Sequence, residues 1–325
     1  MPKEQPLSLP KPLQNHTIEV LHCDWGASIG KRWLARARLE KGRTEVFAPS
    51  CIHDPCELVI LLSELCDIRS KILLGFDFPL GVPKAYADLA GIHKFNALLA
   101  KLRSNEWPCF FSLAADADSI SLQRPFYPKG SRNVRRVDLV RRLGVQSFDD
   151  LLRRCERKQD YRGAACPLFW TLGPNQFGRG AILGWKDVVI PLLHQPPPEA
   201  ALWPFDGRLT SLLERYAVII VETYPAEYYH WFFGKWKGKQ NVEERKRVGA
   251  YLLKWAEIVG LKLNGPLRRA ISDGFPDGRD DAFDAVIGLF AMIEVLAGRR
   301  PSGEPNEDSV QNVEGWILGL CPGRG

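Results

Sequence analysis

The stretch IEVLHCDWGASIGKRWLARARLEKGRTEVFAP, residues 18–49, decides the fold. Its first part, residues 18–25, is apolar and rich in side chains that favour strands. Residues 33–40 alternate between apolar and polar side chains, which is typical of a strand with one buried face. Residues 41–43 (KGR) then predict a hairpin turn into a third strand. The stretch therefore predicts the antiparallel beginning of a sheet.

Further strand and helix patterns follow this stretch. Residues 55–66 predict a helix, with Asp54 placed to cap its first turn. Residues 72–78 predict a short buried strand that Pro79 ends, and residues 217–225 (AVIIVETYP) give the clearest strand pattern of the chain. Later helices are expected at residues 227–233, 243–259 and 280–297. Together these patterns predict an α/β fold, with a mixed sheet flanked by helices.

The middle of the chain, residues 86–215, has a different character. Its helical patterns, at residues 89–102, 137–158 and 181–193, are separated by proline-rich connections. We expect this region to be a large, mostly helical insertion or cap subdomain. The expected division is a polar N-terminal tail at 1–16, a core at 17–85 and 216–298, the basic insertion at 86–215, and a C-terminal tail at 299–325 whose residues 313–318 return to the core.

The composition is that of a globular protein that can bury a full core. The chain of 325 residues is 45% hydrophobic and 25% charged. No run approaches the roughly 18 consecutive apolar residues of a membrane-spanning helix, and the N-terminus lacks an apolar signal region. The eight cysteines contain no CxxC pair, which argues against zinc and favours a reducing compartment. We therefore expect a cytoplasmic protein without a membrane partner.

Positive charge is concentrated in two segments. Residues 129–162 carry eleven Lys and Arg against five Asp and Glu, and residues 235–247 carry six against two. Concentrated positive charge is typical of a protein that binds a phosphate backbone, here DNA or RNA. The alternative is a solvated helix face. The candidate nucleic-acid-binding residues are Arg132, Arg135, Arg136, Arg141, Arg142, Lys235, Lys237 and Lys239.

Five acidic residues lie at positions where an α/β fold forms its sites. Asp24 lies within the first expected strand, and Asp77 and Glu222 lie at the ends of two others. The carboxyl ends of parallel strands meet at one edge of a sheet, where ligands bind. Asp281 and Asp284 are three residues apart and share one face of the last helix. Each acid also has a structural explanation: a turn, a helix dipole, or a pairing with arginine.

Converging acids favour a site for hard cations. Carboxylate oxygens are the ligands that Mg²⁺ or Mn²⁺ prefers, and two such ions activate water and stabilise the leaving oxygen of a phosphodiester. We therefore expect Asp24, Asp77, Glu222, Asp281 and Asp284 to be both catalytic residues and metal ligands. Packed carboxylates repel one another when no metal is bound, which predicts at least one raised pKa in the cluster.

With these motifs the chain resembles the family catalogued as domain of unknown function 429, whose members are predicted nucleases of RNase H fold. The matching segments are CDWG (23–26), GFDFPLGVP (75–83), VETYPAE (221–227), DDAFDAVIGL (280–289) and EGWILG (314–319). The spacing of Asp281 and Asp284 also resembles the last catalytic motif of RuvC-type resolvases. The resemblance implies an RNase H-like mixed sheet and a two-metal nuclease in which Asp24 contacts both ions.

Two other functions remain open at this level. The segment DWGAS (24–28) resembles the first phosphate loop of the actin and sugar-kinase class, so a phosphotransferase or ATPase is one alternative. A second glycine-rich loop is missing after residues 217–222, which argues against it. The other alternative is a non-catalytic nucleic-acid-binding or assembly protein that retains the fold. The sequence indicates no particular protein partner.

Overall fold

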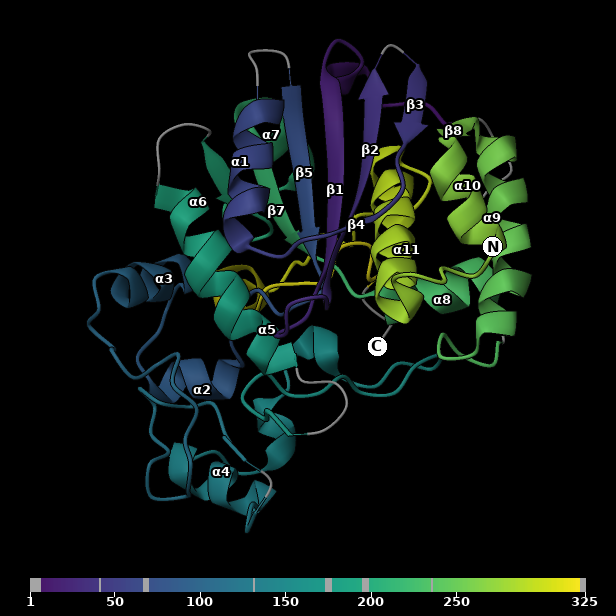
Figure 1. The fold of residues 1–325 in the computed structure, drawn as a ribbon. Coiled ribbons are helices and arrows are strands. Elements are labelled where there is room, and N and C mark those ends of the chain that lie inside the picture. Colours follow the sequence, from purple (N-terminus) through teal and green to yellow (C-terminus); the bar gives the residue numbers. More distant parts are fainter. Residues whose placement is uncertain are drawn as a thin grey trace.

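A mixed sheet of eight strands forms the centre of the protein (Figure 1). The computed structural model describes residues 7–40, 42–66, 70–130, 132–172, 177–194, 199–234 and 236–321. The strands run in the order β6-β7-β5-β1-β2-β3-β8, and β4 pairs with β2. Their bounds are β1 Thr17–Trp25, β2 Arg32–Glu40, β3 Arg43–Val46, β4 Ser50–Cys51, β5 Ser70–Phe76, β6 Ala200–Leu202, β7 Val218–Glu222 and β8 Leu261–Leu263.

Strand direction divides the sheet into two parts. β1, β2 and β3 pair antiparallel, as the hairpin pattern predicts. β5 pairs parallel to β1, and β7 pairs parallel to β5, so the carboxyl ends of these three strands meet at one edge. The short strands β6 and β8 extend the sheet on its two sides in parallel pairings that the sequence patterns did not predict. The expected α/β architecture, with a mixed sheet flanked by helices, is confirmed.

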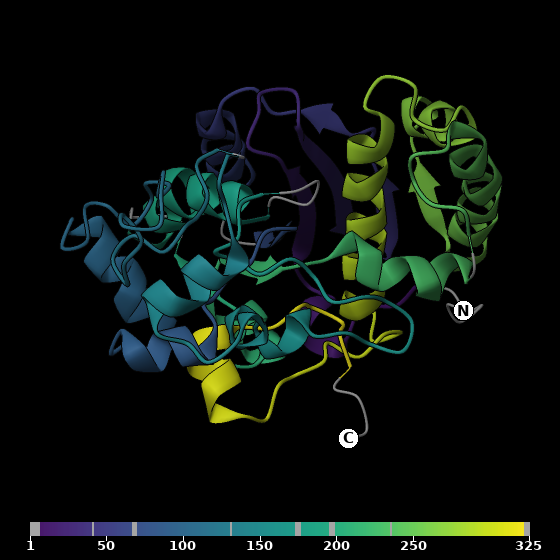
Figure 2. The ribbon, with the colours of Figure 1, turned by 90° about the horizontal axis from the view of Figure 1, so that it is seen from below.

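The alternation of side chains along the strands builds two hydrophobic cores, one on each face. In β7, Ile219 and Val221 pack on one face, while Val218 and Ile220 pack on the other. The first face is covered by α7 Leu209–Arg215, α8 Pro225–Phe233, α9 Val242–Val259, α10 Gly265–Ser272 and α11 Arg279–Leu296. The second core contains side chains from α1 Pro55–Leu65, α2 Lys84–Leu89, α3 Phe95–Arg103, α4 Arg136–Leu143, α5 Phe177–Gly184 and α6 Ile190–His194, with α2 and α4 beyond the carboxyl end of the strands (Figure 1). Figure 2 shows the strands between α1 and α11. None of these helices, in the part of the chain that the structure describes, is long and apolar enough to cross a membrane.

The region at residues 86–215 is less regular than its sequence predicts. The helix expected at 137–158 is wrong: α4 ends at Leu143, because Gly144 adopts a left-handed conformation with φ of +78°. Two short 3₁₀ turns, Phe148–Leu151 and Arg154–Glu156, follow instead. In place of the single helix expected at 89–102, α2 ends at Leu89 and α3 begins at Phe95, with a turn between them. β6, within the same region, is an edge strand of the main sheet.

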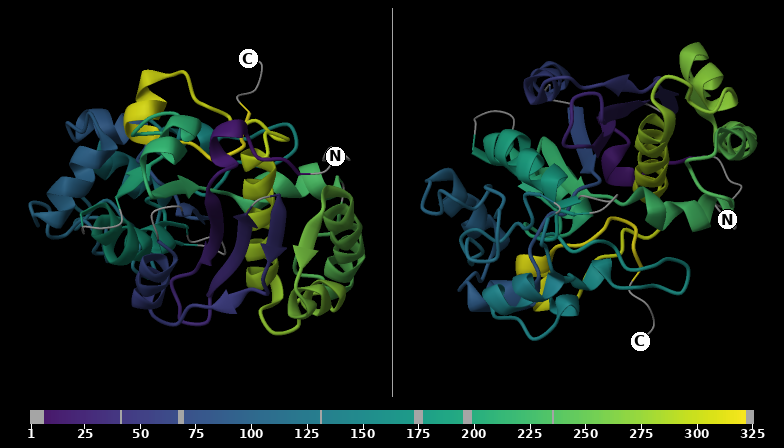
Figure 3. Two further views of the ribbon diagram at one scale, coloured as in Figure 1. Left: turned by 90° about the horizontal axis from the view of Figure 1, so that it is seen from above. Right: turned by 60° about the horizontal axis from the view of Figure 1, so that its bottom comes forward.

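The C-terminal segment returns to the sheet as expected. Ile317 forms a parallel bridge with Glu222, and the amide of Leu318 donates a hydrogen bond of 2.8 Å to the carbonyl oxygen of Glu222. The amide of Val82 also donates to the carbonyl oxygen of Val313 at 2.8 Å. Figure 3 shows this yellow segment crossing the carboxyl end of the strands.

α11 packs closely on β1 because a glycine faces a histidine there. A Cβ atom at Gly288 would lie 2.2 Å from the ring of His22, which is fully buried. The ring is held in place by Thr223 Oγ1 at 2.7 Å and the carbonyl oxygen of Ala285 at 2.9 Å. Burial lowers the pKa of His22 to about 3, so the ring is neutral. The residue is structural.

We expect Gly288→Ala to destabilise the protein by about 1–3 kcal/mol, because the added methyl group overpacks the contact between α11 and β1. This loss outweighs the gain of roughly 1 kcal/mol that alanine brings to a helix. Urea unfolding followed by circular dichroism measures the effect. Gly163→Ala is the control, because nothing lies within 4 Å of a Cβ atom there. Equal stabilities of the two variants would contradict the close packing.

Candidate active site

Three of the five predicted acids meet at the carboxyl end of the sheet. Asp24 is the penultimate residue of β1, and Asp77 directly follows β5, which pairs with β1. The backbone amide of Trp25 donates a hydrogen bond of 2.7 Å to Asp77 Oδ1, which holds this carboxylate beside β1. Asp284, in the second turn of α11, approaches from the helix that covers this face. We call Asp24, Asp77 and Asp284 the acid cluster.

Burial and mutual repulsion disfavour negative charge in the acid cluster. Burial, followed by the nearby Asp77 and Asp284 carboxylates, raises the pKa of Asp24 well above its usual range. Burial also raises the pKa of Asp77, and it raises that of Asp284 to about 6. The contact between the Asp24 and Asp77 side chains raises the pKa of Asp24 further and partly lowers that of Asp77. The expectation of raised pKa values in this cluster is confirmed.

Lys239 and Tyr229 complete the surroundings of Asp284. The Lys239 ammonium contacts Asp284 Oδ2, and the Tyr229 hydroxyl donates to Asp284 Oδ1. Although burial disfavours its charge, the carboxylates of Asp284 and Asp24 raise the pKa of Lys239. Lys239 was predicted to bind nucleic acid, and its ammonium instead contacts a carboxylate of the acid cluster. Sequence reasoning missed Tyr229, because it lies in an aromatic-rich run (YYHWFF, residues 228–233) that is typical of core packing.

Glu222 does not join the acid cluster, which corrects its predicted role as a metal ligand. Arg153, fully buried, donates to Glu222 Oε1 at 2.6 Å and to Glu222 Oε2 at 2.7 Å. Both carboxylate oxygens are therefore bound by a guanidinium fork. Glu222, Arg153 and Asp77 line a cavity of only about 10 Å³, which has room for about one water molecule. The structural explanation, pairing with arginine, holds for Glu222.

Asp281 also lies apart from the acid cluster. Its carboxylate binds Lys31 Nζ at 2.6 Å on the surface, where the Lys31 side chain is 55% exposed. The adjacent Asp280 accepts a hydrogen bond of 2.6 Å from Gln240 Nε2. Residues three apart share a helix face, but α11 becomes more exposed toward its N-terminus: Asp284 is 3% exposed, whereas Asp281 is partly exposed. The predicted ligand role of Asp281 is therefore not supported by its position.

Most predicted nucleic-acid-binding arginines already have acidic partners. Arg135 and Arg141 pair with Asp138, and Arg142 pairs with Asp118. Arg136 differs: its guanidinium lies 4.6 Å from the ring centroid of Phe148 and 5.7 Å from that of Trp170. No ion pair of Arg136 is found among the described residues. Arg132 and Lys237 are exposed, and Lys235 lies outside the described residues.

The acid cluster has the ligand atoms of a divalent-cation site, but its side chains are not arranged as a complete coordination sphere. Asp24, Asp77 and Asp284 offer only carboxylate oxygens, which suit Mg²⁺ or Mn²⁺. Over the residues that the structure describes, however, no three His, Cys, Asp or Glu side chains are arranged to hold a metal ion. The hydrogen bond between Asp24 and Asp77 and the ammonium of Lys239 already occupy these oxygens. A cation would therefore have to displace these contacts.

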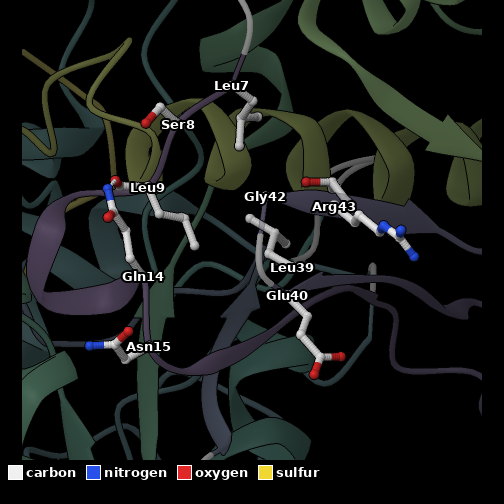
Figure 4. A pocket seen from close by; sticks show the side chains of 10 residues that line it. Leu7, Ser8, Leu9, Gln14, Asn15, Leu39, Glu40, Gly42 and Arg43 are labelled. Atoms are coloured by element: carbon white, nitrogen blue, oxygen red, sulfur yellow. Dashed lines mark hydrogen bonds between the residues drawn. The ribbon is translucent and has the colours of Figure 1, made fainter.

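The cavity in Figure 4 lies at the other end of the sheet. It measures about 430 Å³ and is lined by the segment before β1 and by the hairpin of β2 and β3, with Glu40 and Arg43 as its charged residues. Glu40 ends β2, whose first residue, Arg32, pairs with Trp25 beside Asp24. The length of the strand puts this cavity roughly 25–30 Å from the acid cluster. It is not part of the site.

No protein-family model, no curated protein and no solved structure matches this chain. The geometry and electrostatics of the acid cluster are therefore the main support for a function.

We expect Asp24→Asn to leave the metal-free protein as stable as wild type or more stable, because it removes a repelled carboxyl without changing its shape. Native Asp24 holds its proton to higher pH than the unfolded chain does, so the wild type loses stability as pH rises through that window. The advantage of Asp24→Asn should therefore grow by about 1 kcal/mol or more from pH 5 to pH 8. Thermal melts in EDTA measure it.

Glu222→Gln is the matched control, because it neutralises an acid that also ends a parallel strand. This variant leaves the buried Arg153 without its main counter-charge, and we expect a loss of about 3 kcal/mol. A similar loss in Asp24→Asn would show that Asp24 holds the fold together, which would remove it from the candidate site.

Proposed function

We propose that this protein is a metal-dependent nuclease of RNase H-like fold, which hydrolyses nucleic-acid phosphodiester bonds at the acid cluster. The observation that carries the proposal is the convergence of Asp24, Asp77 and Asp284, three carboxyls from separate elements with raised pKa values. Raised pKa values at a shared position are typical of functional sites. A purely structural carboxylate has a full set of donors, as Glu222 has in the guanidinium of Arg153.

The strand arrangement supports the RNase H-like part of the proposal. Three antiparallel strands, β1 to β3, are followed by β5 and β7 on the far side of β1, both parallel to it. The acid cluster lies at the carboxyl end of β1 and β5, with α11 packed against β1. The same segments carry the resemblance to the domain of unknown function 429 family. The fold itself hosts several activities, so the site has to carry the reaction.

The residues that would hold the cation are Asp24, Asp77 and Asp284. A divalent cation bound there supplies a polarised water and stabilises charge on the leaving oxygen. The chain's own contribution is to bury the carboxyls and to orient them: the Trp25 amide fixes Asp77, and the Tyr229 hydroxyl fixes Asp284. Glu222, bound by Arg153, contributes to the shape of the site and not to its ligands.

A nucleic-acid substrate is supported by exposed basic residues in the region at 86–215. Arg136 and Arg132 are exposed, and Arg136 is already held over two aromatic rings. A guanidinium in this position can contact a phosphate or stack with an exposed base. The phosphotransferase alternative predicts that a nucleotide raises the melting temperature, and the non-catalytic alternative predicts binding without cleavage.

Cleavage of labelled single-stranded, double-stranded and branched DNA and RNA tests the proposed reaction directly. We expect activity with Mg²⁺ or Mn²⁺ and none with EDTA. Asp24→Asn, Asp77→Asn and Asp284→Asn should each lower the rate by about a thousandfold or more, because each removes a ligand charge. Asp281→Asn, which loses only a surface pair with Lys31, should stay within threefold of wild type. An equal loss in Asp281→Asn, or activity that survives in all three cluster variants, would contradict the assignment.

Oligonucleotide binding in EDTA tests the role of Arg136 separately from the reaction. We expect Arg136→Ala to weaken the binding of a single strand by about three- to tenfold. The slope of log affinity against log salt concentration should fall by about one, which corresponds to the loss of one phosphate contact. Arg141→Ala should change the affinity by less than twofold, because Arg141 already faces Asp138 at 3.7 Å. Fluorescence anisotropy at two salt concentrations gives both values. Equal effects of the two substitutions would show only a diffuse charge effect.

A further inference from the structure

Lys239 lies where the acid cluster needs a cation. Its ammonium contacts Asp284 Oδ2 and lies 3.9 Å from Asp280 Oδ2. Asp24 also attracts it. Among the described residues it is the cation that contacts the cluster. Asp284 has its second oxygen bound by Tyr229, so neither of its oxygens is free.

The position of Lys239 is built by the surrounding structure. Arg245, buried in α9, donates to the carbonyl oxygen of Lys239 at 2.5 Å and to that of Gly274 at 2.8 Å. Gln240, next along the chain, binds Asp280 at the start of α11. The backbone that carries the lysine is thus fixed to the segment before α11, while the lysine side chain remains one-third exposed. The ammonium can therefore leave for solvent without a change in the backbone.

We propose that Lys239 is a built-in cation that competes with the divalent metal: metal binding displaces its ammonium from Asp284 into solvent. This inference rests on the proposed function. A divalent ion bound at Asp284 would repel the ammonium at the same carboxylate, and it would compete for an oxygen that has few lone pairs to offer. In the metal-free site, the ammonium of Lys239 offsets part of the negative charge. It weakens metal binding because its contact with Asp284 has to be broken before the metal can bind.

The first test compares the Mn²⁺ affinity of wild type with that of Lys239→Gln. This substitution removes the charge but keeps a polar side chain of similar length. Isothermal titration, with free Mn²⁺ followed by electron paramagnetic resonance, gives the affinity without any cleavage. We expect Lys239→Gln to bind Mn²⁺ at least tenfold more tightly than wild type. Lys237→Gln, which removes an exposed charge from the same segment, should stay within twofold. In EDTA, Lys239→Gln should melt at a lower temperature than wild type, and Mn²⁺ should raise its melting temperature more.

A second measurement detects the displacement in the wild-type protein. The protein is labelled with an amine-acylating reagent, with and without Mn²⁺, and the labelled lysines are quantified by mass spectrometry. We expect Mn²⁺ to increase the labelling rate of Lys239 severalfold and to leave that of Lys237 unchanged. This measurement separates direct displacement from a general charge effect, and it does not depend on the folding of a variant.

Several results would overturn the inference. Equal or weaker Mn²⁺ binding by Lys239→Gln would do so, as would unchanged or slower labelling of Lys239 in the presence of metal. If wild type binds Mn²⁺ and cleaves nucleic acid while either of these results is found, only the role of Lys239 fails. If neither protein binds Mn²⁺, both the inference and the metal-dependent reaction fail.

Discussion

The buried guanidinium of Arg153 is the interaction on which the carboxyl end of the sheet depends. It binds Glu222 at the end of β7, Glu156 in its own turn, and the carbonyl oxygens of Leu80 and Glu314. One cation thereby joins the region at 86–215, the segment after Asp77 and the returning C-terminal segment. A fully buried charge is tolerated only when nearly all its donors have acceptors, so these segments must pack in one arrangement.

The same edge of the sheet carries two groups of acids with opposite environments. Glu222 ends β7 and Asp77 follows the neighbouring parallel strand β5, yet Glu222 has a complete guanidinium partner. Asp77 shares the acid cluster with Asp24 and Asp284, and one ammonium faces all three. The cluster thus has an excess of negative charge when it is ionised, which a structural network would not retain. This contrast separates an acid that holds the edge together from the acids that support the proposed function.

The sequence predicted the core of the fold and part of the site. Alternation in residues 33–40 and the apolar runs of β1, β5 and β7 give strong strand signals, because one or both faces of each strand are buried. β6 and β8 have only three residues each, and their pairing depends on tertiary contacts. The sequence patterns identified the acids at strand ends, but they did not show which of these acids is paired with a basic residue. Arg153 looked like part of a solvated basic run, since its burial depends on residues distant in the chain.

The returning C-terminal segment also sets the timing of folding. Arg153 Nη1 donates to the carbonyl oxygen of Glu314, a residue 161 positions later in the chain. At 5–20 residues per second, a ribosome needs on the order of ten to thirty seconds to add the residues between them. Until then the guanidinium lacks one acceptor, and the segment after Asp77 lacks its neighbour at Val313. A nascent chain can therefore form the strands early, but it acquires the finished edge of the sheet only after residues 313–318 have emerged.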